Sequence, residues 1–391
     1  MSYVTGTATD VGDFLTRLDA FLTVGHTLDP LYTGVGTGTL TGLLGTAASV
    51  LETITVTFAD AATFTVAGSV SGALGAGTVG VAFASPVVAF TAVAGTTAWA
   101  AGDTVVVTMT PPWVQRRFST TANDDAQYCV WKAPGNDGAS AIYVAARRIN
   151  NVTGDYDNLR LNGYTAYDPG LAFTAQPGAI AASHPLLPLL RVGSIPYWFV
   201  ANGRRVAIVA KCSTVYVAGY LGLITPYLNP SACPYPLFIG GSLAFSGEPV
   251  VTSINWRWSY QGFEMALFPK TMVGAPVGAF GCRFRRIDGT WVAFSAWRRL
   301  DSQQGNGGLW TPDKQNGSDA RPGLDGSYPL IPFACSESTP PNVWGELDGV
   351  AWVSGHANAA ENTVIQNRIP WLVVQNVFRT TKVDYMAVKL A

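Results

Sequence analysis

The sequence predicts a mainly β protein, with a small β-sandwich module, a larger antiparallel β domain with long loops, and one N-terminal amphipathic helix. Three observations support this prediction. Apolar residues recur at helical spacing near the N-terminus, and β-branched residues alternate with small ones in the next segment. Dipeptides typical of turns recur through the remainder. A chain of 391 residues can also bury a large core without a disulfide or a metal ion.

Residues 9–22 carry the helix signal. Their apolar side chains recur at spacings of three and four residues, which places them on one helical face. Thr9 or Asp10 can cap the start, and Gly25 follows the end. We assign residues 1–33 to an N-terminal helical arm of the main domain, whose apolar stripe must pack against that domain or a neighbouring subunit. The stripe comprises Val11, Phe14, Leu15, Leu18, Phe21 and Leu22.

Residues 34–112 differ in composition from the rest of the chain. They contain no Lys or Arg, and their acids are Glu52, Asp60 and Asp103. Alternating Val, Ile, Phe and Thr, separated by Gly, Ala and Ser clusters, predict four or more short strands. A segment of about 80 residues has the size of a small β-sandwich. We therefore predict an inserted all-β module at 34–112, which Pro111-Pro112 closes.

Residues 113–391 form the predicted main β-rich structural domain. Turn dipeptides that favour type I′ hairpins recur there, because both central residues of such a turn take positive φ. Strand-like segments flank three of the four dipeptides, and long loops are expected around 151–190 and 301–345. Loops of that length are normally functional or ordered by partners. The dipeptides are Asn202-Gly203, Asp288-Gly289, Asp325-Gly326 and Asp348-Gly349.

Composition excludes several classes of protein. Charged residues make up 13% of the chain, against about 25% in an ordinary soluble domain. Aromatic residues at 12% argue against disorder, and a net charge of -1 argues against binding to nucleic acid. The most apolar stretch, residues 79–101, is interrupted by Pro86 and small residues, so we expect no membrane insertion.

The N-terminus and the cysteines predict synthesis in a reducing cytoplasm. The first residues lack the basic and apolar regions of a signal peptide. The chain has an odd number of cysteines and no CxxC pair, which favours free buried thiols. The five are Cys129, Cys212, Cys233, Cys282 and Cys335.

No motif predicts catalysis, a cofactor or a metal site. The histidines, His26, His184 and His356, have neither metal-ligand spacing nor a neighbouring nucleophile motif, so we expect structural roles for them. Paired carboxylates could serve glycoside hydrolysis, and an acidic turn could loosely hold Ca²⁺, but a solvated turn is the favoured interpretation. The carboxylate candidates are Asp124 with Asp125, and Asp155 with Asp157.

Trp and Arg adjoin each other at 256–258 and 297–299. These residue types are enriched where proteins contact each other, while aromatic faces also stack on sugar rings. Core packing, subunit contact and carbohydrate binding therefore all remain open for them. As candidate subunit contacts we select the helix residues Phe14, Leu18 and Phe21 together with Trp256, Trp258, Trp297 and Trp371.

Several segments resemble a family of virion structural proteins of tailed bacteriophages. The N-terminal YVTGTA (3–8) and the Gly/Thr-rich module at 34–112 are similar to segments of phage tail and fibre proteins, which implies an immunoglobulin-like insert. The resemblance covers most of the chain in patches and carries over no catalytic residue. The other segments are WFVANGRR (198–205), STVY (213–216), YLGLITPYLNP (220–230), YPLFIGGS (235–242), GELDGVAWVSGHANAAEN (345–362) and VVQNVFRT (373–380).

Low charge and this resemblance together imply a non-enzymatic component of a phage virion. We expect it to be tail-associated (tube, baseplate, collar or fibre), made in the host bacterial cytoplasm and assembled symmetrically with other copies of itself and with other virion structural proteins. Two alternatives remain. A receptor- or glycan-binding adhesin would use aromatic residues in the loops at 151–190 or 301–345 to contact host surface glycan. A depolymerase would need an acidic cleft.

Overall fold

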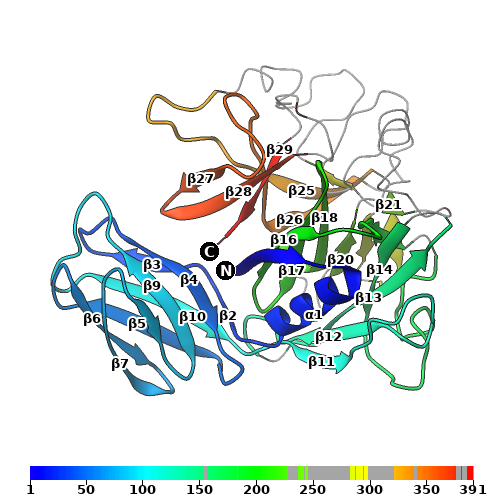
Figure 1. Ribbon diagram of the computed structural model, residues 1–391, viewed down its shortest axis with the longest axis horizontal. Helices are drawn as coiled ribbons and strands as arrows, with labels where there is room; N and C mark the ends of the chain where they lie inside the picture. The colour runs from blue at the N-terminus through cyan, green and yellow to red at the C-terminus, as the bar shows by residue number, and fades with distance from the viewer. Residues whose placement is uncertain are drawn as a thin grey trace.

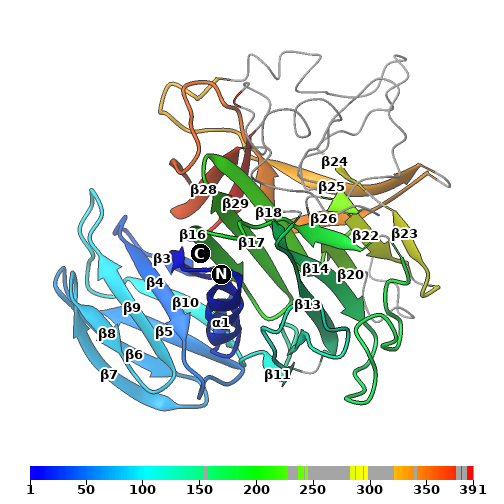
Figure 2. The same ribbon diagram turned by 45° about the vertical axis from the view of Figure 1, so that its right-hand side comes forward.

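The computed structural model describes residues 1–138, 140–153, 156–182, 184–227, 237–241, 243–244, 282–286, 288–293, 295–297, 321–338, 341–375, 380 and 385–390. It confirms the mainly β fold that the sequence predicts. Strands in several antiparallel sheets dominate, and one helix, α1 (Val11–Leu22), is present among the described residues. Figures 1 and 2 show a small lobe at the lower left, made by the inserted segment, and a larger body that holds both chain ends.

A seven-stranded sheet, which we name the central sheet, runs through the larger body. Its first strand comes from the N-terminus and pairs antiparallel with β16, from Ser2 opposite Ala201 to Ala8 opposite Ile195. In order, its strands are β1 (Ser2–Ala8), β16 (Ile195–Ala201), β17 (Arg205–Cys212), β18 (Val215–Leu223), β20 (Leu237–Gly240), β22 (Cys282–Arg285) and β23 (Trp291–Ala293).

Two further sheets complete the larger body. The flanking sheet contains β11 (Val114–Arg117), β12 (Cys129–Ala133), β13 (Ile142–Asn151), β14 (Tyr156–Tyr164), β15 (Pro185–Leu187) and β21 (Leu243–Ala244). The C-terminal sheet contains β24 (Ser295–Trp297), β25 (Ile331–Ser338), β26 (Pro341–Trp352), β29 (Tyr385–Lys389), β28 (Ile369–Gln375) and β27 (Thr363–Gln366), with β19 (Thr225–Pro226) beside β26.

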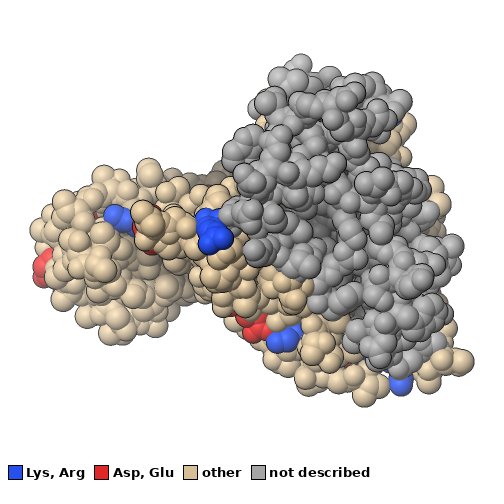
Figure 3. All heavy atoms as spheres, turned by 90° about the horizontal axis from the view of Figure 1, so that it is seen from above, with Lys and Arg blue, Asp and Glu red and all other residues tan. Residues whose placement is uncertain are grey.

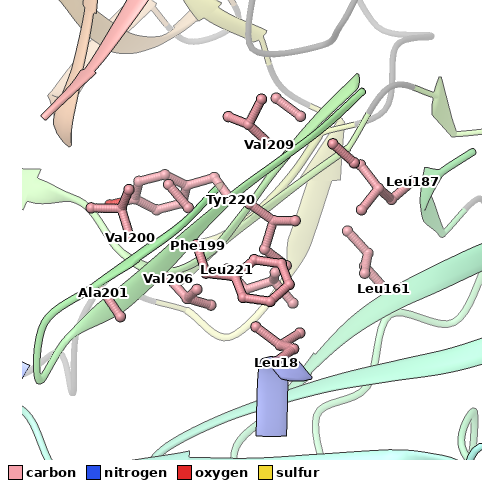
Figure 4. Close-up of a cluster of buried hydrophobic side chains, with 14 of the residues drawn as sticks. Leu18, Leu161, Leu187, Phe199, Val200, Ala201, Val206, Val209, Tyr220 and Leu221 are labelled. Atoms are coloured by element: carbon pink, nitrogen blue, oxygen red, sulfur yellow. The ribbon is translucent and has the colours of Figure 1, made fainter. Parts of the chain in front are cut away.

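Helix α1 packs between the central and flanking sheets. Asp10 caps its first turn by accepting a 2.9 Å hydrogen bond from the backbone N–H of Asp13. Its apolar stripe meets both sheets, so that Leu18 lies with Phe199 and Leu221 of the central sheet and Leu161 of the flanking sheet (Figure 4). A helix this short needs such packing, because isolated short helices are marginal in water.

The helix stripe is part of the chain's own core, so the expectation that Phe14, Leu18 and Phe21 form subunit contacts is wrong. Their exposed fractions are 0%, 1% and 4%. Phe14 makes edge contacts with the rings of Tyr197 and Phe199 at centroid distances of 5.9 and 5.0 Å. A periodic apolar stripe indicates that a helix face is buried, but it does not indicate which surface covers it.

The inserted segment forms two sheets packed face to face. One contains β2 (His26–Thr27), β3 (Leu31–Thr33), β10 (Thr104–Thr110), β5 (Glu52–Phe58), β6 (Thr63–Gly68) and β7 (Gly72–Thr78), and the other contains β4 (Thr39–Gly45), β9 (Val88–Val93) and β8 (Ala82–Ala84). Apolar side chains from both sheets form one core, in which the ring of Trp99 stacks on Phe58 with centroids 3.9 Å apart.

The connectivity of this sandwich matches that of an immunoglobulin variable domain in most strands. The order β10-β5-β6-β7 corresponds to strands F-C-C′-C″, and β4-β9-β8 corresponds to B-E-D. The N-terminal strands β2 and β3 pair antiparallel with β10 in the place of strand G. Residues 26–33 therefore belong to the insert, and the boundary predicted at residue 34 lies too late. Strands of two and three residues around Pro30 are too short to show an alternating pattern.

Two other local expectations are wrong. Asp348-Gly349 lies inside β26 and makes no hairpin turn. Asn202-Gly203 does join β16 to β17, but neither residue has positive φ. Instead, Oδ1 of Asn202 accepts hydrogen bonds from the backbone N–H groups of Arg204 (2.8 Å) and Arg205 (3.1 Å). This local side-chain turn replaces the type I′ geometry that the dipeptide favours.

The long loops predicted at 151–190 and 301–345 are shorter than expected. Strand β14 occupies residues 156–164 of the first segment. In the second segment, β25 and the start of β26 occupy most of the described residues from 331 onward. Residues 301–320 lie outside the described residues. Strand β14 is buried along nearly its whole length, so it lacks the polar–apolar alternation that marks a half-exposed strand.

A buried charge network joins the central and C-terminal sheets. The guanidinium of Arg205, at the start of β17, is fully buried, and its Nε lies 3.5 Å from Oδ2 of Asp348 on β26. Nδ2 of Asn202 donates a 2.7 Å hydrogen bond to the same carboxylate oxygen. Burial alone would raise the pKa of Asp348, but the positive charge of Arg205 and this amide outweigh it, so the pKa is lowered.

Candidate assembly surface

Two of the carboxylates singled out in the sequence, Asp125 and Asp157, are paired with arginines, while Oδ1 of Asp124 accepts a 2.8 Å hydrogen bond from the backbone N–H of Ala126. Asp157 is buried, and Nη2 of Arg148 lies 2.6 Å from its Oδ2 while Nε contacts both oxygens at 3.0 Å. Nη1 of Arg147 lies 2.5 Å from Oδ1 of Asp125. Asp155 lies outside the described residues. The Arg148–Asp157 pair joins the neighbouring strands β13 and β14, and the Arg147–Asp125 pair joins β13 to the turn before β12.

The buried histidines and thiols face the protein interior. Burial lowers the pKa of His26 to about 3 and that of His184 to about 4. Cys129, Cys212, Cys282 and Cys335 are free and buried, as the sequence predicts. Burial raises the pKa values of Cys129 and Cys212 to about 12, which keeps these thiols protonated and unreactive. Cys233 lies outside the described residues.

Among the described residues, no group of three or more His, Cys, Asp or Glu side chains is placed to hold a metal ion. In the same residues, no helix has both the length and the apolar character needed to cross a membrane.

Residues 34–112 of the insert expose almost no charge. Of the three acids between residues 34 and 112, Glu52 and Asp103 are buried at 4% and 3% exposure, and only Asp60 is exposed. Asp60 itself accepts hydrogen bonds from the backbone N–H groups of Ala62 and Thr63 in a turn. The face of this lobe seen in Figure 3 is accordingly mostly tan, with few blue or red spheres.

The two buried acids serve the fold of the insert itself. Oε2 of Glu52 accepts hydrogen bonds from the backbone N–H groups of Val70 and Ser71 at 3.2 and 3.0 Å. The carboxylate of Asp103 accepts three backbone hydrogen bonds at 2.9 Å, including those of Val35 and Gly36. Backbone donors, first that of Ala100, lower the pKa of Asp103. Both carboxylates therefore support turns and leave the surface neutral.

Apolar side chains replace charges on this surface. Val35, Val70 and Val81 are 67%, 69% and 58% exposed, and Leu31 is 65% exposed. Soluble surfaces commonly carry about 25–35% charged residues. We name the exposed residues of 31–103 the insert surface. It combines the charge depletion and the exposed apolar groups that are typical of the buried part of a protein–protein interface.

The structure describes the side chain of only one of the four tryptophans selected as subunit contacts. Trp371, on β28, is half-buried against the core of the C-terminal sheet, and Nζ of Lys389 lies 5.6 Å from its ring centroid. Trp256 and Trp258 lie outside the described residues, and Trp297 ends β24 with a side chain that is not described. Their role in subunit contact stays a prediction.

A second surface feature is a hollow at the edge of the flanking sheet, with a volume of about 440 Å³. It is lined by Gln115 and Arg116 of β11, Tyr143 of β13, and Tyr167 and Pro169 of the following loop. Arg117 holds this loop against the sheet, because its guanidinium lies 5.8 Å from the ring centroid of Tyr167. The described lining residues offer two aromatic rings, a cation and an amide, and none of them is a carboxylate.

The absence of charge at 34–112 is visible in the sequence, but the burial of Glu52 and Asp103 is not. Sequence reasoning also missed the hollow, since β11, β13 and the loop after β14 come together only in the folded chain. Comparison with protein-family profiles gives no match, and a search of curated proteins gives none either.

Proposed function

We propose that this protein is a non-enzymatic structural component of a tailed-phage virion. In this proposal it is tail-associated and assembles with other copies of itself and with other virion proteins through the insert surface. The supporting observation is that residues 34–112 expose one charged side chain, Asp60. Covering such a surface desolvates almost no ions and removes exposed valines from water, so association is favourable there.

The remainder of the described chain is consistent with a building block. Some of its arginines and acids pair with each other inside the chain, as Arg148 does with Asp157 and Arg205 with Asp348. Its four described thiols are buried and free, which suits synthesis in a reducing bacterial cytoplasm. The tail position itself comes from the resemblance of the sequence segments, and tube, baseplate, collar and fibre are all kept within the proposal.

The test measures self-association of the purified chain by size-exclusion chromatography with light scattering. We expect the native chain to form oligomers by about 100 µM. The double variant Val70→Lys and Val81→Lys on the insert surface should be monomeric. The matched control is Val152→Lys and Val192→Lys, since these valines of the larger body are equally exposed at 70% and 69%. It should assemble normally.

A native chain that remains monomeric at this concentration would contradict the proposal, and so would equal loss of assembly in both double variants. Electron microscopy of the particle provides the independent measurement. The insert surface should lie against a neighbouring chain there, and an insert surrounded by solvent would overturn the assembly role.

The hollow beside β11 supports a second candidate function, that of a glycan-binding adhesin. Tyrosine faces stack on sugar rings, and Gln115 and Arg116 can donate hydrogen bonds to sugar hydroxyl groups. Tyr167 also lies in the 151–190 segment that the sequence singled out. The described lining residues do not include the carboxylate pair that a depolymerase of the glycosidase type requires, so they do not favour that alternative.

Glycan-array binding of the native chain tests this second function. Bacterial envelope glycans should bind, and Tyr143→Ala or Tyr167→Ala should weaken binding by about tenfold or more, as expected for loss of one stacking face. Tyr227→Ala is the matched control, because Tyr227 is an exposed tyrosine outside the hollow. Absence of binding by the native chain would remove the adhesin function.

A further inference from the structure

The hollow beside β11 lies on the outer face of the flanking sheet, away from α1. On the inner face, Val144 belongs to the main core that also contains the helix stripe. On the outer face, Ala145 packs with the buried ring of Phe173 from the loop after β14. Successive side chains of a strand point to opposite faces of the sheet. Tyr143, two residues before Ala145, therefore meets the hollow from the outer face.

A lysine emerges beside the hollow on the same face. Lys132, on β12, lies directly opposite Tyr143 of β13 and Val114 of β11. Directly opposite residues of antiparallel strands project from the same face, with Cβ atoms about 4.5–5.5 Å apart. Lys132 therefore projects next to Tyr143, which lines the hollow.

An arginine enters the lining at a β-bulge. The pairing of β11 with β12 shifts register between Gln115 and Arg117, so that Arg116 is the extra residue. Bulges are common at sheet edges, where they re-aim a side chain. Arg116 is exposed and lines the hollow. Two neighbouring strands thus bring one cation each to the same aromatic site.

Neither cation is used within the described part of the chain. Arg116 and Lys132 take part in none of the ion pairs between described residues, and neither side chain forms a hydrogen bond there. By contrast, Arg147, on the same strand as Tyr143, binds Asp125. Arg116 is exposed and Lys132 is partly exposed, so both charges are accessible to a ligand at the hollow.

Two acids near the hollow are bonded to the chain itself. Oδ1 of Asp168, in the loop that lines the hollow, accepts a 2.7 Å hydrogen bond from the backbone N–H of Gly170. Oδ1 of Asp19, on α1, accepts a 2.8 Å hydrogen bond from Nε1 of Trp131 on the inner face. Arg117, at the end of β11, adds a third cation beside the two described above. The cations around the hollow therefore outnumber these acids and leave a positive local charge.

We propose that the hollow binds an anionic sugar, one that carries a carboxylate or a phosphate group. The sugar ring stacks on the rings of Tyr143 and Tyr167. Arg116 and Lys132 bind its charged group, since guanidinium groups hold carboxylate and phosphate oxygens through paired hydrogen bonds. A volume of about 440 Å³ suits a small ligand.

This inference deepens the second proposed function, that of an adhesin, and rests on it, since both place a sugar in the hollow. A neutral sugar fits less well, because it leaves two accessible cations without a counter-charge. Nucleic acid also fits less well, because its binding uses cations that track the whole backbone. The chain instead has a net charge of -1 and confines these cations to one hollow.

The first test measures which bacterial envelope glycans bind the full chain on a glycan array. Uronic acid polymers and phosphate-bridged sugar polymers form separate arms, which identify the charged group, and neutral polymers form a third arm. We expect one anionic arm to bind at least about tenfold more tightly than the neutral arm. Neutral glycans that bind as tightly overturn the inference and leave the adhesin function standing. Absence of all glycan binding overturns both, and tighter binding of a short single-stranded oligonucleotide overturns the inference.

The second test removes the two cations. The double variant Arg116→Gln and Lys132→Gln should weaken binding of the best anionic glycan by at least about tenfold in isothermal titration calorimetry. It should also reduce the dependence of that binding on sodium chloride concentration. The matched control is Arg17→Gln and Arg321→Gln, since both arginines are exposed and lie outside the hollow. Circular dichroism should show that both double variants are folded.

The control variant should bind the anionic glycan with an affinity within about twofold of the native chain. Equal weakening in the two double variants would assign the preference to overall charge and overturn the inference. Native affinity in the Arg116→Gln and Lys132→Gln variant would overturn it as well, because the charged group of the sugar would then be bound elsewhere.

Discussion

Replacing Arg205 with methionine should lower the free energy of unfolding by about 3–5 kcal/mol, because it removes the nearest cation from the largely buried carboxylate of Asp348. Arg205 is fully buried and is the positive charge nearest to that carboxylate in the network between the central and C-terminal sheets. Nδ2 of Asn202 also donates a 2.7 Å hydrogen bond to this carboxylate, and the positive charges of Arg204 and Lys389 act on it more weakly. Equilibrium denaturant unfolding measures the loss.

A second substitution distinguishes the effect of the uncompensated Asp348 charge from the effect of lost packing around residue 205. In the Arg205→Met background, Asp348→Asn should recover part of the stability, since it removes the uncompensated charge and keeps a hydrogen-bonding side chain. Lys211→Met is the control, because its partner Glu361 and Lys211 itself are partly exposed, at 42% and 32%. That exposed pair should contribute less than about 1 kcal/mol. An Arg205→Met cost as small as the control would show that the network does not join the two sheets energetically.

The glycine that follows Asp348 is part of the same arrangement. Gly349 has φ of +67°, and a Cβ at this position would lie 2.1 Å from Nη2 of Arg205. A side chain there would meet both backbone strain and the buried guanidinium. The Asp-Gly dipeptide therefore makes room for Arg205 inside β26, although the sequence pattern associates it with hairpin turns.

The chain should lose stability steeply in acid because two buried histidines are held neutral. His26 and His184 have folded-state pKa values of about 3 and about 4, against an unfolded value of about 6.5. Between these values the unfolded chain binds more protons than the folded chain, so the free energy of unfolding falls as the pH falls below 6.5. Each histidine should reduce stability by about 2 kcal/mol at pH 5 relative to pH 7.

Substitution of His26 by leucine isolates its contribution. The ring nitrogens make no well-formed hydrogen bond among the described residues, and the ring centroid lies 5.0 Å from that of Phe21. His26→Leu should therefore change stability little at pH 7 and flatten the loss between pH 7 and pH 5. Thr27→Val is the control, since it alters the adjacent buried position on β2 without removing a titrating group. An unchanged pH slope in His26→Leu would contradict this account. Denaturant titrations at several pH values provide the measurement.

The sequence by itself determined the features that arise from neighbouring residues. The spacing of apolar residues and the cap at Asp10 define α1, and alternation of β-branched residues defines most strands of the insert. Composition alone also reveals that residues 34–112 are nearly uncharged. Helical and strand patterns have periods of a few residues, so a single sequence suffices to detect them.

Only the tertiary structure decided which surfaces meet. Phe14 and Leu18 look equally suitable for a subunit contact or a core in the sequence, and packing between two sheets places them in the core. Arg205 and Asp348 are far apart in the chain, and β7 is an edge only because no described strand pairs with its outer side. Contacts between distant segments depend on how the sheets fold together, and a local pattern carries no information about its partner.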